Sequence, residues 1–98
     1  MHARVVTVEG QPERTDDVIG QVRDQIVPIL EGQDGFKGFT FLADRSSGKA
    51  MGISFWESEE AMQASEDAIR DTRDGVATTS GGGAPAVEFF EVAVDTMA

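Results

Sequence analysis

The strand-like segments of this sequence carry apolar residues on both of their faces. In Lys49–Trp56, Met51 and Phe55 lie on one side and Trp56 on the other, because successive residues of a strand alternate between faces. Helices can cover one face of such a sheet. Leaving the other face in water would forfeit roughly 25 cal/mol per Å² of apolar surface and promote aggregation. We therefore expect a second copy of the chain to cover it, which predicts a homodimer with two sheets packed face to face.

The order of the predicted segments indicates the fold. Ala3–Glu9 and Ala86–Val94 have the composition of strands, and Phe36–Ala43 and Lys49–Trp56 form a predicted hairpin around Gly48. Apolar residues at helical spacing predict one helix between the first two strands and another between the last two. The order strand, helix, strand, strand, helix, strand is that of ferredoxin-like (βαββαβ) α+β folds. These have a four-stranded antiparallel sheet with two helices on one face.

Capping residues and breakers predict the ends of the two helices. Thr15 is expected to cap the first helix, and Pro28 to kink it or loosen its last turn. Ser58 is expected to cap the second helix, and Gly75 to end it. The Gly-rich stretch 78–85 then reads as a flexible connection.

Composition excludes several classes of function. Eighteen acidic against eight basic residues give a formal charge of -10, which argues against nucleic acid and anionic membranes as partners. The chain has no Cys, and its one His is His2 near the N-terminus, so no disulfide, metal site or Ser-His-Asp triad is expected. No apolar stretch approaches the roughly 18 residues of a membrane span. We expect residues 1–98 to form a single soluble domain in the cytoplasm.

Several short motifs follow one another along the chain. A Val-rich first strand is followed by VPIL ahead of Gly35 and Phe36, by FWES at 55–58, by a helix that begins EEAMQA, and by VEFFEVAV in the last strand. With this set the sequence resembles the antibiotic biosynthesis monooxygenase superfamily, the dimeric α+β barrels, over nearly its whole length. The resemblance implies a fold more closely than a chemistry. The superfamily includes cofactor-free oxygenases, haem-degrading enzymes and small barrels with no known activity.

The resemblance offers two chemistries that need different residues. Haem-degrading members carry an Asn near the end of the first strand, a Trp at the end of the third, and an iron-ligating His on the second helix. Trp56 fits this pattern, but Val6 and Thr7 stand near the Asn position, and Ser65 or Glu66 at the His position. Neither replaces an imidazole, so haem degradation is disfavoured. The cofactor-free oxygenases need no metal or flavin: a phenol is deprotonated in an apolar pocket, and its anion reduces dioxygen directly.

The resemblance therefore implies a cofactor-independent monooxygenase that acts on a small aromatic phenol or quinol, or on a polyketide-type substrate. An alternative stays open: a non-enzymatic dimeric barrel that binds a small apolar metabolite, or a structural or interaction domain. The absence of Tyr and of a usable His favours this alternative. No residue is assigned a catalytic role. The pocket is expected between sheet and helices, and its candidate residues are Trp56, Phe41, Phe55, Met62, Ser65, Thr7 and Phe89.

Each of these residues also has a simple structural interpretation. A lone Trp at a strand end is commonly a core anchor, and strand Phe residues commonly fill a core or an interface. Arg4, within the first strand, is expected to pair with Glu88 or Glu91 across a neighbouring strand, with neutralisation of a substrate anion as the alternative. Glu88 and Glu91 are expected to protect an edge strand from further pairing.

Overall fold

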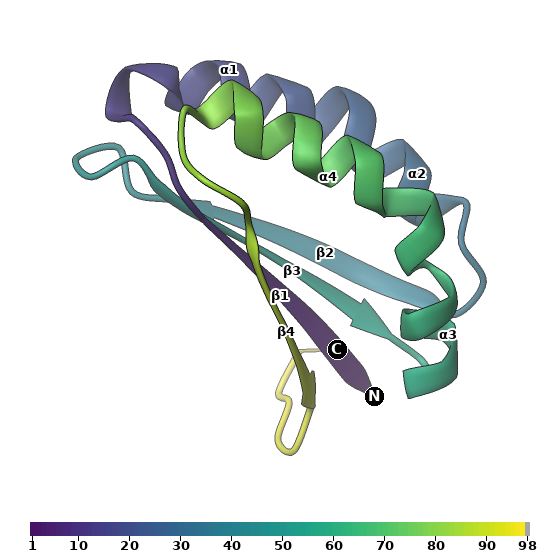
Figure 1. Ribbon diagram of the computed structural model, residues 1–98. Helices are drawn as coiled ribbons and strands as arrows, with labels where there is room; N and C mark the ends of the chain where they lie inside the picture. Colours follow the sequence, from purple (N-terminus) through teal and green to yellow (C-terminus); the bar gives the residue numbers. More distant parts are fainter. Residues whose placement is uncertain (98) are drawn as a thin grey trace.

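A computed structural model describes residues 1–97 as a four-stranded antiparallel sheet with helices on one face (Figure 1). The chain forms β1 (His2–Glu9), α1 (Thr15–Gln21), α2 (Val27–Glu31), β2 (Phe36–Ala43), β3 (Lys49–Trp56), α3 (Glu59–Ala64), α4 (Glu66–Ser80) and β4 (Ala86–Glu91). The strand order β2-β3-β1-β4 confirms the ferredoxin-like α+β fold. Within residues 1–97, no helix has the length and apolarity needed to cross a membrane.

The first helical arm is interrupted, and it begins differently from the prediction. A π-helical segment, Val22–Ile26, joins α1 to α2. Pro28 accounts for it, because proline lacks an N–H and its ring crowds the carbonyl four residues earlier, so the helix widens. The predicted cap at Thr15 was wrong. A 3-10 turn at Pro12–Arg14 starts the helical path earlier, and Thr15 is buried inside α1 without a capping bond.

The second helical arm is longer than predicted. Ser58 caps α3 as expected, since its Oγ accepts a hydrogen bond from the Ala61 N–H at 3.1 Å. The prediction that Gly75 ends this arm was wrong, because α4 continues to Ser80. Val76 is 5% exposed, and burying it outweighs the cost of about 1 kcal/mol for a glycine inside a helix. The start of the stretch predicted to be flexible is therefore helical.

Strand β4 is shorter than predicted. It ends at Glu91 rather than at Val94. Beyond this end, the Val92 N–H donates to the Met1 carbonyl oxygen at 2.9 Å. Val94 is 86% exposed.

The core lies between the helices and one face of the sheet. Trp56 of β3 is fully buried, and the ring of Phe36 packs edge-on against it with the centroids 5.5 Å apart. The helices contribute the other buried members of this core: Val18, Val22, Ile26, Leu30, Met62, Ile69 and Val76.

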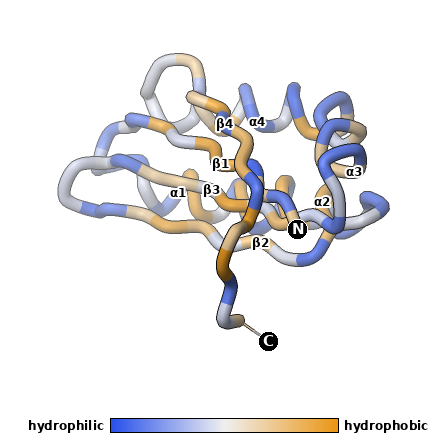
Figure 2. Tube along the Cα trace, turned by 90° about the horizontal axis from the view of Figure 1, so that it is seen from below, coloured by the Kyte–Doolittle hydropathy of each residue, from blue (hydrophilic) through white to orange (hydrophobic). Residues whose placement is uncertain are grey.

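Within residues 1–97 the helices leave the opposite side of the sheet, here called the open face, uncovered (Figure 1). Ile53 and Phe55 on this face are only half-buried, and Leu42 and Phe90 are each 50% exposed. Seen from below, the strands show hydrophobic stretches (Figure 2). The sheet is thus apolar on both faces, as the strand patterns indicate.

Gly48 holds the hairpin in a conformation that a side chain would disturb. Its φ is +82°, and a Cβ there would meet the backbone oxygen of Gly10. Gly48→Ala is expected to lower the free energy of unfolding by more than about 1 kcal/mol, as measured by urea denaturation. Gly83→Ala is the control, because a Cβ there meets open space. Equal effects of the two substitutions would contradict this account.

Candidate functional site

A cavity of about 50 Å³ lies between the helices and the sheet. Its walls are mainly apolar and include Val6 of β1, Phe39 and Phe41 of β2, and Ile69 of α4. Val6, Phe39 and Phe41 are only half-buried although they face the helices, so the two layers leave apolar surface unfilled between them. The rings of Phe39 and Phe41 lie 20° from parallel, with centroids 6.5 Å apart. They form an aromatic wall suited to a flat ligand.

One end of the cavity is polar and centres on Arg4, which is 2% exposed. Its Nη1 donates to Ser65 Oγ at 2.8 Å, to Glu66 Oε1 at 3.0 Å and to the Met62 carbonyl oxygen at 3.4 Å. The guanidinium carbon lies 5.3 Å from the centre of the Trp56 ring. Arg4 therefore ties the middle of the sheet to the junction of α3 and α4.

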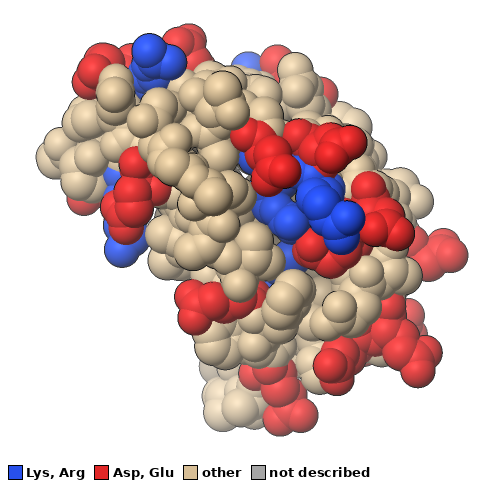
Figure 3. All heavy atoms as spheres, viewed as in Figure 1, with Lys and Arg blue, Asp and Glu red and all other residues tan. Residues whose placement is uncertain are grey.

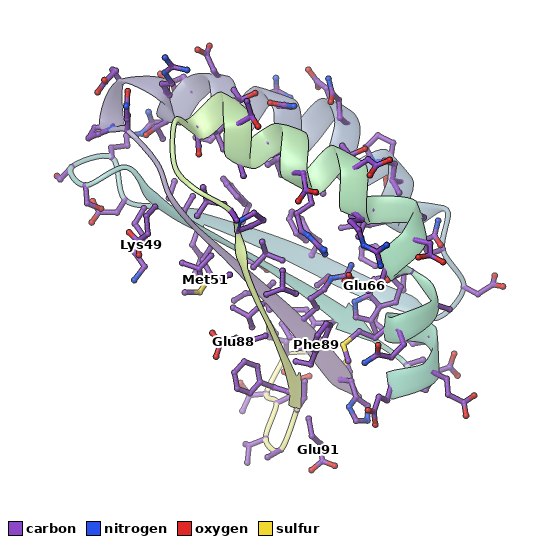
Figure 4. All side chains as sticks on the ribbon, viewed as in Figure 1. Lys49, Met51, Glu66, Glu88, Phe89 and Glu91 are labelled. Atoms are coloured by element: carbon purple, nitrogen blue, oxygen red, sulfur yellow. The ribbon has the colours of Figure 1, made fainter. Side chains whose placement is uncertain are left out.

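The predicted pairing of Arg4 with Glu88 or Glu91 was wrong. Arg4 lies opposite Phe89 in the β1–β4 register, on the face that carries the helices. Glu88 points to the open face (Figure 4), and Glu91 is exposed at the end of β4. A buried guanidinium needs a carboxylate within the same buried layer, and Glu66 supplies it from α4.

Glu66 also binds a second arginine, Arg73. Nη1 and Nη2 of Arg73 donate to its two carboxylate oxygens at 2.9 and 3.0 Å. The hydrogen bond from Arg73, reinforced by the charges of Arg73 and Arg4, holds the pKa of Glu66 below its usual range. Burial lowers the pKa of Arg4, and the charge of Glu66 opposes that shift. One carboxylate thus bridges two guanidiniums beside the cavity, and Figure 4 shows Glu66 at the start of α4.

Ser54 connects the cavity to Trp56. The indole Nε1 donates to Ser54 Oγ at 2.8 Å, and Ser54 lines the cavity while being only 3% exposed. Because Ser54 Oγ is the acceptor in this bond, its own O–H is available to a ligand. Arg4 is the cross-strand partner of Ser54, so the two side chains share one face.

The structure brings four of the predicted pocket residues together. Phe41 lines the cavity. Trp56, Met62 and Ser65 are buried around its polar end, which they contact through Arg4. Their positions suit a supporting role more than direct contact with a ligand.

The other three predicted residues lie elsewhere. Phe89 is on the helix side of β4 and is 43% exposed (Figure 4). Thr7 and Phe55 lie on the open face, because each is a chain neighbour of a residue that faces the helices. Placing Phe55 in the same pocket as Trp56 conflicts with the alternation of side chains along β3.

The sequence reasoning did not single out Arg73, and it considered Glu66 only at the position of an iron-ligating His, not as the partner of Arg4. Glu66 and Arg73 lie seven positions apart on α4, and Ile69 and Val76 of the same helix are buried. That spacing puts all four on one face of the helix. A glutamate and an arginine on the same helix face as buried aliphatic residues could have indicated a buried ion pair.

A ferredoxin-like sheet with an apolar cavity beneath its helices defines a class of small α+β domains suited to holding a ligand between the two layers. The antibiotic biosynthesis monooxygenase family model matches residues 1–69, and the chain belongs to this family.

Relatives and solved structures agree with this assignment. Uncharacterized protein Rv2557 of Mycobacterium tuberculosis is 43% identical over 93 residues, which are 95% of this chain and 41% of that protein. The chain thus spans about two fifths of the length of the curated relatives it matches. A monooxygenase from the gene ActVA-Orf6 of Streptomyces coelicolor, in complex with nanaomycin D, has a TM-score of 0.81 at 18% identity, covering 99% of this chain and 91% of that one. A MhuD variant with two manganese protoporphyrin IX molecules per active site has a TM-score of 0.78 at 19% identity, with both chains fully covered. At such identities these two structures show a shared fold.

Glu66→Gln tests the bridging carboxylate. The substitution leaves Arg4 and Arg73 without a counter-charge and is expected to cost about 3 kcal/mol of unfolding free energy at pH 7. Because folding lowers the pKa of Glu66, its contribution is fully present above the ordinary glutamate pKa of roughly 4.3 and is lost as the pH falls through the folded value. The difference between the parent protein and the variant, measured by urea denaturation, should therefore shrink in acid.

Glu60→Gln is the matched control, since Glu60 is exposed on α3. Its effect at pH 7 is expected within about 0.5 kcal/mol. A Glu66→Gln difference that stays constant between neutral and strongly acidic pH would contradict the bridging role.

Proposed function

We propose that this chain is a cofactor-independent monooxygenase that oxidises a small aromatic phenol or quinol. The observation that carries the proposal is the apolar, aromatic-walled cavity with Ser54 and Arg4 at its polar end, in a chain of the antibiotic biosynthesis monooxygenase family. A monooxygenase of the same fold in complex with nanaomycin D supports a small-molecule ligand. The volume of about 50 Å³ is below the roughly 150 Å³ that holds a benzene ring and far below the roughly 300–1,000 Å³ of ordinary ligand pockets. The helices and the sheet must therefore move apart to admit even a compact substrate, and a large polyketide fits less well.

The proposed reaction needs no external reductant. The phenol or quinol loses a proton, and the resulting anion passes electrons to dioxygen. When the ring C–H para to a phenolic oxygen becomes a carbonyl, the phenol and dioxygen give a quinone and water: one oxygen atom enters the product, the other leaves as water, and the substrate supplies all four electrons. The protein then has to exclude water and favour the anionic form of the substrate.

Ser54 and Arg4 are suited to that second task. A phenol ordinarily ionises near pH 10. The positive charge of Arg4 lowers that value for a phenol beside it, and the free Ser54 O–H can donate to the phenolate oxygen. The indole of Trp56 fixes the orientation of the Ser54 side chain through the 2.8 Å hydrogen bond from its Nε1 to Ser54 Oγ. In this proposal Trp56 is a positioning residue.

A second function has its own supporting observation. The polar cavity-lining residues among residues 1–97 are Arg4, Ser54 and Arg73, and none of them is a base near neutral pH. Glu66 is bridged by both arginines and its pKa is low, so it is a poor proton acceptor. This favours a barrel that binds a small ligand without turnover. Haem degradation is disfavoured, because Ser65 and Glu66 stand at the position of the iron-ligating His and both bind Arg4.

Oxygen consumption by metal-free protein separates the two functions. We expect uptake that depends on a small phenol or quinol, and a loss of at least about tenfold in kcat for Ser54→Ala, because one oxyanion donor is removed. Ser46→Ala, in the exposed hairpin, should keep the parent rate. Thermal unfolding of both variants checks that they are folded. Quenching of Trp56 fluorescence by the quinol without oxygen uptake would instead select the binding function.

We also infer that the open face mediates a homodimer. Met51, Ile53 and Phe55 of β3 form a half-buried apolar strip, and Leu42 and Phe90 beside it are each 50% exposed. Figure 4 shows Met51 on the side of the sheet away from the helices. A second copy offers a surface of the same chemistry and can bury this strip by symmetric packing.

Sedimentation at micromolar concentration is expected to give a dimer. Ile53→Lys places a charge in the apolar strip and is expected to raise the dimer dissociation constant by at least about tenfold. Gln63→Lys adds the same charge on exposed α3 and should leave association unchanged. A parent protein that sediments only as a monomer would refute the inference.

A further inference from the structure

The polar end of the cavity carries an excess of positive charge. Arg4 and Arg73, whose side chains are 2% and 11% exposed, share the single carboxylate of Glu66. The chain as a whole has the opposite character: its formal charge is -10, and Figure 3 shows acidic groups spread over the face in view, with the largest basic group near the middle of that face. An uncompensated charge is costly where solvent is excluded. The cluster therefore favours an additional anion.

The hydrogen-bond donors of this cluster are also incompletely used. Nε of Arg73 is buried and has no hydrogen-bond partner within residues 1–97. Glu66 accepts hydrogen bonds from Nη1 and Nη2 of the same guanidinium, so the edge of the guanidinium that includes Nε remains available to an acceptor. The three side-chain hydrogen bonds of Arg4 all start from Nη1. A buried donor without an acceptor is destabilising, and a ligand oxygen that reached Arg73 would remove that penalty.

The apolar walls of the cavity indicate which chemistry the uncharged part of the ligand must have. Phe39 and Phe41 form its aromatic wall, and Ile69 and Val76 of α4 close it from above. We propose that this cavity binds a small aromatic carboxylate, with the ring against Phe39 and Phe41 and the carboxylate at Arg73. A carboxylate matches the planar edge of a guanidinium and supplies the charge that the cluster lacks. The inference rests on the proposed function in one respect, that the cavity receives a ligand.

Phenylacetate and phenylacetamide test the proposal, because they share a shape and differ in charge. Their affinities can be followed by calorimetry and by the fluorescence of Trp56, the one Trp of the chain. We expect phenylacetate to bind at least about tenfold more tightly than the amide. Arg73→Met should remove that preference and leave the affinity for phenylacetamide within about twofold, a pattern that a merely structural arginine would not produce.

Arg70→Met is the matched control on the same helix. Arg70 is 55% exposed and pairs with Asp67, so its loss should change neither affinity. If Arg73→Met does not fold, Arg73→Lys replaces it. This variant keeps the charge but loses Nε and the planar fork, and it should still weaken phenylacetate binding selectively.

Three results would overturn the proposal: equal affinity for the two compounds, binding of neither, or equal losses from the Arg70 and Arg73 variants. Oxygen uptake separates this inference from the proposed function. Turnover of a neutral quinol together with equal affinities for phenylacetate and phenylacetamide would contradict this inference and support the proposed monooxygenase function. Tighter binding of phenylacetate than of phenylacetamide without any oxygen uptake would support this inference and contradict the monooxygenase function.

Discussion

Arg4 is buried on a central strand of the sheet, beneath the junction of α3 and α4. An arginine in the middle of a sheet cannot stay charged there without a carboxylate at hydrogen-bonding distance. Glu66 provides it, and to do so it must stand at the first turn of α4, directly after Ser65, where α3 and α4 meet. The same contact sets the height of the second helical arm above β1. The hydrogen bonds to Ser65 Oγ and to the Met62 carbonyl oxygen fix the junction further.

That arrangement also explains why the cavity lies where it does. Arg73 reaches Glu66 from two turns further along α4, so the helix presents a polar side chain to the sheet between Ile69 and Val76. A stripe of aliphatic side chains alone could pack closely onto the strands. Long arginines that bind a carboxylate instead hold the layers apart, and Val6, Phe39 and Phe41 keep apolar surface that no other side chain of residues 1–97 fills. The cavity is thus a consequence of the ion cluster beside it.

The sequence specifies the fold more completely than the site, for physical reasons. Period-two patterns place β2 and β3 with their observed bounds, and the Ser58 cap follows from short-range chemistry. The end of α4 depends on tertiary burial of Val76, which overrides the local effect of Gly75. The partner of Arg4 is set by contacts 62 positions apart in the chain, which local patterns do not encode. Trp56 was recognisable as important, whereas its bond to Ser54 required the backbone to be in place.

Side chains alternate between the two faces of the sheet along β3, so the neighbours Phe55 and Trp56 have different roles. Phe55 faces the open side and Trp56 the core, so a slip of one residue in the pairing of β1 with β3 would exchange the two sets of side chains. Both sets are apolar, and the hydrophobic effect alone discriminates weakly between the two registers. Arg4 discriminates strongly, because a slipped register would move its guanidinium away from Glu66 and onto the apolar open face. The buried ion cluster is therefore best understood as the element that fixes the register, and through the register it decides which face associates and which face encloses the cavity.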